Sequence, residues 1–147
     1  MIRLIEKSGQ SLTEPVTLAQ AKAHLCRDSS DDDDYINGLI SAAREACEND
    51  AKRSFIQRSF IQRFHFFPSN LEAIQLDIGP LKEAAGITHV KYIAADGTLT
   101  TLDAANYLVH YDSFLPRIEL APNKTWPDTR LQEAAVTVEF IAGISPC

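Results

Sequence analysis

The residues of this chain that could carry out catalysis include four scattered histidines: His24, His65, His89 and His110. A serine or cysteine nucleophile needs a histidine beside it and a carboxylate that orients the histidine. The sequence has no GxSxG elbow, no HExxH and no phosphate-binding glycine loop. Scattered histidines do not by themselves exclude a triad formed on folding. We nevertheless expect no enzyme, no catalytic residue and no cofactor.

Histidine and cysteine residues could also bind a metal ion. His24 and Cys26 form an HxC pair, but no second pair with ligand spacing follows. A structural zinc site needs four ligands, so we expect no metal. Cys47 is in register with the apolar residues Ile36 and Ile40, which predicts that it packs in the core as a small hydrophobic residue.

The acidic run from Asp28 to Asp34 resembles a calcium-binding loop only superficially. An EF-hand loop that starts at Asp28 needs glycine where Asp33 stands and glutamate where Leu39 stands. We interpret the run as a break between two helices, with Ser30 or Asp31 capping the second.

Aromatic and cationic residues alternate in the next segment of the chain. The phenylalanines are Phe55, Phe60, Phe64, Phe66 and Phe67, and the arginines among them are Arg58 and Arg63. Single-strand nucleic-acid binders combine such residues as a stacking platform. The alternative, which we favour, is a sheet face filled by aromatics, since strands prefer these residues.

Composition limits the function classes. The chain has 147 residues, 45% of them hydrophobic, and a net charge of −6. This length predicts a single domain, 1–147, with a helical region over 1–53 and a β-rich region over 54–147. The acidic balance disfavours tight DNA binding, and no apolar run approaches the ~20 residues of a membrane span. Three cysteines without CxxC spacing and no signal peptide favour the cytoplasm.

Two helices are predicted after an N-terminal tail, residues 1–14. The first covers about 17–26 and begins with a capping box formed by Thr17 and Gln20. The second covers about 32–52 and has the clearest 3.6-residue period in the chain. Its apolar face carries Tyr35, Ile36, Leu39, Ile40, Ala43, Ala46 and Cys47, and its polar face includes Arg44, Glu45 and Glu48.

An antiparallel β module is predicted over about 54–142. A long strand follows Arg53, with Ile56, Phe60, Phe64 and Phe66 on one side, although Arg58 and Gln62 interrupt it. The further strands are 74–76, 87–94, 99–102, 107–111, 117–120 and 135–142. Asp96-Gly97 is a typical hairpin turn. The fold class is therefore α+β.

Several segments in this order resemble the head-tail connector family of tailed bacteriophages. They are EPVTLAQAK at 14–22, DDYINGLISAAREACE at 33–48, VKYIAADG at 90–97, Trp126-Pro127, and VTVEFIAG at 136–143. The likeness covers nearly the whole chain and points to the long branch of the family, with a β module. The chain ends at Cys147, where long members carry a further helical segment.

The resemblance implies a structural virion protein of the neck, assembled in the host cytoplasm. Its subunits form a ring, expected to be dodecameric, below the portal protein. The ring extends the DNA channel and is the docking platform for a stopper or tail-completion protein. DNA passes through the lumen without sequence-specific binding, and an acidic wall repels its phosphates. The alternative is a protein-binding α+β module of phage or prophage origin with no virion role.

A ring requires two different faces of one subunit to meet. The candidate interface residues are on or just after the second helix: Arg44, Glu45, Glu48, Lys52 and Arg53. The alternative for these residues is a solvated helix face.

Overall fold

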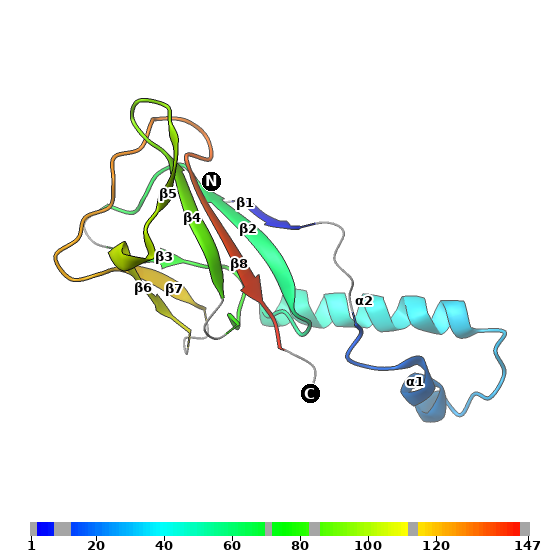
Figure 1. Cartoon of the computed structure of the whole chain (residues 1–147). Helices are drawn as coiled ribbons and strands as arrows, with labels where there is room; N and C mark the ends of the chain where they lie inside the picture. Colours follow the sequence, from blue (N-terminus) through cyan, green and yellow to red (C-terminus); the bar gives the residue numbers. More distant parts are fainter. Residues whose placement is uncertain (1–2, 8–12, 70–71, 83–85, 112–114, 145–147) are drawn as a thin grey trace.

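The computed structural model describes residues 3–7, 13–69, 72–82, 86–111 and 115–144. A two-helix arm projects from a β module that contains two antiparallel sheets (Figure 1). The helices are α1 (Leu18–Leu25) and α2 (Asp33–Ala51), and a short 3-10 turn, η1, covers Ala104–Asn106. The predicted α+β class is confirmed.

The larger sheet has five strands in the order β1-β2-β8-β4-β5. Their bounds are Arg3–Glu6 for β1, Arg58–Phe64 for β2, Val136–Ala142 for β8, Ile87–Ile93 for β4 and Leu99–Leu102 for β5. The central β8 pairs with β2 on one side and with β4 on the other. Phe140 of β8 lies opposite Phe60 of β2, and Val138 of β8 lies opposite Val90 of β4. The predicted turn at Asp96-Gly97 joins β4 to β5, and Gly97 adopts φ +91° there.

The strand β1 corrects the prediction of an N-terminal tail. It pairs antiparallel with β2, and Glu6 lies opposite Phe60. A four-residue edge strand has too little pattern to be recognised in a sequence, and it forms only because β2 offers it a free edge.

The smaller sheet has the order β3-β7-β6, with β3 at Ile74–Gln75, β7 at Arg117–Leu120 and β6 at Tyr107–His110. The hydrophobic core combines buried residues of both sheets, among them Val138 and Phe140 of β8 and Ile118 of β7. Side chains of β8 alternate between buried and partly buried positions along the whole strand. This period of two is expected of a strand with one face on a core.

The polar interruptions predicted in β2 are buried and satisfied. The Gln62 side chain accepts a hydrogen bond from the Asp77 backbone N–H at 3.0 Å and donates one to the Gln75 carbonyl at 3.3 Å. It thereby ties β2 to the segment around β3. Phe66 was predicted on the same side, but it is exposed because β2 ends at Phe64.

Both helices begin close to the predicted residues. Thr17 and Gln20 form the capping box: the Gln20 N–H donates to Thr17 Oγ1 at 3.2 Å, and the Thr17 N–H donates to Gln20 Oε1 at 2.9 Å. The predicted cap of α2 is wrong, since the N-cap is Asp32 and its side chain makes no capping bond. Asp31 instead bonds Ser29, so its carboxylate is engaged before the helix begins.

We predict opposite stability changes for two glycine substitutions. Gly143 has φ +122°, and a Cβ there would overlap the backbone carbonyl of Ile56. Gly143→Ala should therefore reduce the free energy of unfolding by about 3 kcal/mol or more.

Gly38, in the middle of α2, has open space around it. Gly38→Ala should raise stability by about 0.5–1 kcal/mol, because alanine is the better helix former.

Urea unfolding followed by circular dichroism measures both changes. A Gly143→Ala variant as stable as the wild type would show that the contact between the end of β8 and Ile56 is not as described.

Candidate interaction surface

A buried ion network lies where α2 meets the β module. At its centre is Glu48, whose Oε2 is 2.7 Å from Arg44 Nη1 and 2.6 Å from Arg58 Nη2. The Glu48 Oε1 atom accepts from the backbone N–H of Phe55 at 2.6 Å and lies 3.4 Å from Ser54 Oγ, whose hydroxyl donates to the Ile56 carbonyl at 2.7 Å. Because the Glu48 side chain is only 6% exposed, these contacts replace water around the carboxylate.

The network extends from the arm to the edge of the larger sheet. Arg58 of β2 also contacts Glu6 of β1 at 2.9 Å. Arg44 also contacts Glu14, which precedes α1, with Nε 2.8 Å from Oε2. Hydrogen bonds from Arg44, and a further one from Ser41, hold the pKa of Glu14 below its ordinary value, while the bond to Glu14 raises the pKa of Arg44. Four segments of the chain are thus joined through two arginines.

The predicted interface residues fall into two groups. Arg44 and Glu48 are not on a solvated helix face, as their positions on the polar side of α2 suggested, because they are 6% and 5% exposed. Their charges are paired inside the subunit. Glu45 and Lys52 are exposed, and Arg53 is partly buried. For all five residues the interface role stays a prediction.

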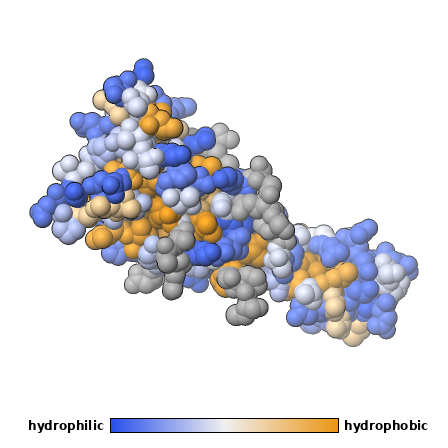
Figure 2. Space-filling model, in the orientation of Figure 1, coloured by the Kyte–Doolittle hydropathy of each residue, from blue (hydrophilic) through white to orange (hydrophobic). Residues whose placement is uncertain are grey.

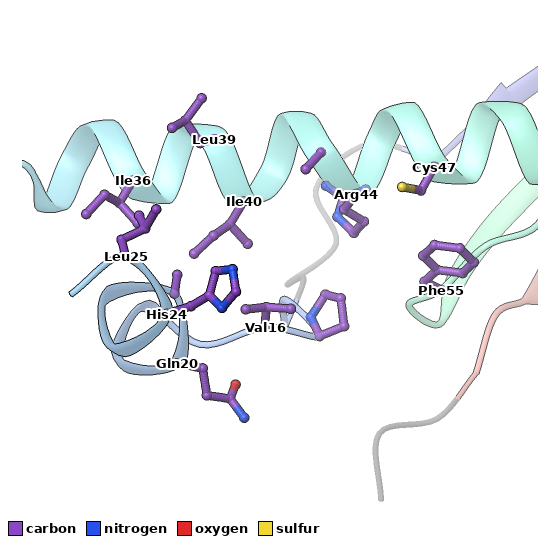
Figure 3. A pocket seen from close by; sticks show the side chains of 13 residues that line it. Val16, Gln20, His24, Leu25, Ile36, Leu39, Ile40, Arg44, Cys47 and Phe55 are labelled. Atoms are coloured by element: carbon purple, nitrogen blue, oxygen red, sulfur yellow. The ribbon is translucent and has the colours of Figure 1, made fainter. Parts of the chain in front are cut away.

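An apolar groove runs along the arm beside the ion network, and Arg44 belongs to both (Figure 3). Its volume is about 510 Å³. The α2 side is formed by Ile40, Ala43 and Cys47, while α1 closes one end and Phe55 the other. We call this feature the arm groove and define it by its lining residues: Pro15, Val16, Gln20, Ala21, His24, Leu25, Ile36, Leu39, Ile40, Ala43, Arg44, Cys47 and Phe55.

The apolar face of α2 is therefore largely open. Ile36 is buried, but Leu39 is 47% exposed and Tyr35 is 70% exposed. Cys47 is exposed as well, which contradicts the predicted core position. The helical period identified the apolar face correctly; however, α1 has only eight residues and covers just the outer end of α2. Hydrophobic side chains are visible on the surface of the arm in Figure 2.

Two of the four histidines pair with carboxylates of the β module. His89 lies 3.1 Å from Glu139, and His110 lies 2.9 Å from Glu119. Within the described ranges, no three histidine, cysteine, aspartate or glutamate side chains gather as metal ligands would. Among the same residues, no helix is long and apolar enough to cross a membrane.

The aromatic stacking platform is also contradicted for its central members. Phe60 stacks on Phe140 with ring centroids 5.7 Å apart, and Phe67 stacks on Trp126 at 4.9 Å. Both Phe60 and Phe67 are buried, so their faces are occupied by other rings of the β module. Arg58 lies over the Phe60 ring and is committed to the ion network.

Comparison with known proteins gives one family and one fold. Residues 15–89 match the family model described as phage gp6-like head-tail connector protein. No curated protein sequence gives a significant match.

Three solved structures with the same fold come from gene transfer agent (GTA) particles. A chain from the neck of an empty GTA particle, computed with C6 symmetry, has a TM-score of 0.73 and 24% identity, over 97% of this chain and 72% of that chain. A chain from the virion of the native particle has a TM-score of 0.71, with the same identity and coverage. A third, from the native neck computed with C12 symmetry, has a TM-score of 0.58 and 23% identity, over 92% and 71%.

We predict that Glu48→Gln destabilises the protein strongly. The substitution keeps the shape of the side chain but leaves Arg44 and Arg58 without their shared carboxylate. The free energy of unfolding should fall by about 3–5 kcal/mol, as expected when one partner of a buried ion pair is removed. Glu45→Gln, at an exposed position on the same helix, is the matched control and should change stability by no more than about 0.5 kcal/mol. Equal losses in the two variants would contradict the central role of Glu48.

We also predict a pH dependence for Glu14. A carboxyl with a lowered folded pKa contributes stability above its unfolded pKa and loses it as pH falls through the folded pKa. The wild type should therefore be more stable than Glu14→Gln at pH 7. This difference should shrink below the ordinary glutamate value of 4.5. Urea unfolding of both proteins between pH 7 and pH 3.5 measures it, and a difference independent of pH would contradict the Glu14–Arg44 contact.

Proposed function

This chain belongs to the family of phage gp6-like head-tail connector proteins, and from that premise we propose that it is a structural adaptor subunit of a virion neck. In this proposal several copies form a closed ring below the portal protein. The ring extends the DNA channel and is the platform on which a stopper or tail-completion protein docks. The subunit acts without catalysis, and assembly starts in the host cytoplasm.

The observation that carries the proposal is the open apolar face of the two-helix arm. The β module has its own core between two sheets, whereas the arm leaves Leu25, Leu39 and Val16 about half exposed along the arm groove. Contiguous exposed apolar surface on a protein marks a site where another protein, a ligand or a membrane binds. A connector requires such surfaces, since it binds its own copies and other neck proteins.

The ion network supports the proposal in a second way. The network around Glu48 joins α2 to β2 and β1 through charged hydrogen bonds, which are stronger than neutral ones. We therefore also propose that the helical region over 1–53 and the β-rich region over 54–147 act as one connector domain.

The acidic character of the chain fits a channel that DNA traverses. With a net charge of −6, a ring of identical subunits carries negative charge of the same sign as the phosphates. Because the wall and the phosphates have like charges, DNA does not adhere to the wall. Non-specific DNA binding would need basic residues that neutralise the phosphates. In this proposal DNA passes through the lumen without sequence-specific contacts.

We predict that the purified protein forms rings, either alone or on assembled portal from the same phage. Sedimentation velocity should detect a species several times heavier than the 16.3 kDa subunit, and negative-stain electron microscopy should show a ring. Serum albumin mixed with portal at the same concentration is the control for non-specific adhesion. A protein that stays monomeric both alone and with portal would refute the connector role and leave the non-virion binding module as the better explanation.

A further inference from the structure

The arm of one subunit has two apolar surfaces, which lie on the two flanks of the apolar face of α2 with Leu39 between them. The first is the arm groove, to which α2 contributes Ile40, Ala43 and Cys47. The second consists of Tyr35, Ala42 and Ala46, which are all exposed and which we call the arm ridge. Their spacing of seven and four residues places them within about 20° of one line along the helix. The centre of the arm groove lies roughly 110° away around α2.

We propose that the arm ridge of one copy of this chain occupies the arm groove of the next copy. This inference rests on the proposed ring and assigns the contact that closes it. Two distinct faces that fit one another produce a head-to-tail contact, which is what a ring of identical subunits requires. A helix whose apolar side lies in a hydrophobic groove is a common mode of protein recognition.

The shapes of the two surfaces suit such a contact. Ala42 and Ala46 are small, so the backbone of the entering helix can approach the groove closely. The larger Tyr35 stands near the outer end of the ridge and is 70% exposed in the subunit. The ridge has one large and two small side chains, and the groove has an open volume of about 510 Å³ between α1 and Phe55.

Charge favours a second copy as the occupant. Each subunit has a net charge of −6, so identical copies repel one another except where their surfaces carry little charge. Arg44 is the one lining residue of the groove with a permanent charge, and it is paired with Glu14 and Glu48. The ridge residues carry no charge at all. The exposed carboxylates of Glu45 and Asp50 border the ridge, and the two apolar surfaces themselves can meet without bringing like charges together.

Symmetry also favours a second copy. Two of the solved structures with this fold come from necks computed with C6 and C12 symmetry. In any such ring each subunit repeats the same contact with its neighbour, so in this proposal every groove receives an identical ridge. A different partner would have to bind every groove separately while the ridges stayed exposed to water.

Disulfide trapping tests the contact directly, because Cys47 is a native probe in the groove. Cys26→Ser and Cys147→Ser leave Cys47 as the remaining thiol, and Ala42→Cys then adds a thiol on the ridge. Residues 42 and 47 are roughly 140° apart around one helix and cannot bond to each other within a chain. Three proteins are compared after mild oxidation: Cys47 alone, Ala42→Cys with Cys47→Ser, and the two thiols together.

The expected result is a ladder of covalent multimers on a non-reducing gel for the protein with both thiols. Each single-thiol protein should stay monomeric on the gel although it forms rings. If rings form and the double-thiol protein gives no ladder, the contact is wrong while the connector role stands. Dimers from Cys47 alone would show a groove-to-groove contact and would also overturn the proposal.

Thiol labelling of the protein without the Ala42→Cys change gives an independent readout. Modification of Cys47 should slow by about tenfold or more when free subunits assemble into rings without portal. Unchanged labelling in the ring, or protection that appears only after portal is added, would overturn the proposal and assign the groove to another protein. A chain that forms no ring with or without portal would refute the proposed function itself and this contact with it.

Discussion

The carboxylate of Glu48 is the point on which the arrangement of the molecule depends. It lies in the last turns of α2, is nearly inaccessible to water, and contacts Arg44 on its own helix and Arg58 on β2. A buried carboxylate is stable only when charged or polar partners replace its water. The two guanidinium groups and the Phe55 N–H supply this environment, and they fix the angle at which the arm leaves the β module.

This constraint explains why the arm presents its apolar side to the outside. The ion network holds the polar side of α2 toward Glu14 and the edge of the larger sheet. The apolar side must then face away from that edge, where only the short α1 and the segment at Pro15-Val16 can cover it. A helix normally buries its apolar stripe against its own core. In this protein the β module has a separate core, so the stripe stays available for a partner.

The separate roles of the arm and the β module suit a connector. The β module is stabilised by alternation on β8, by the paired rings of Phe60 and Phe140, and by the satisfied Gln62. Its stability does not depend on the arm being covered. The arm can therefore exist with an exposed groove until assembly, and burying the groove supplies free energy for the association of subunits.

Local rules were enough to predict much of the fold from the sequence. Four features depend on neighbouring residues, so their pattern is readable in one dimension: the capping box at Thr17 and Gln20, the length of α2, the Asp96-Gly97 turn and the strand predicted at 135–142. The ordered motifs likewise indicated the connector family, which the match over 15–89 shows. The burial of Arg44 and Glu48, the exposure of Cys47 and the pairing of β1 were not predictable in this way. Each depends on which distant segment lies opposite, and the period of a helix shows which residues share a face but not whether that face meets a core, an ion pair or water.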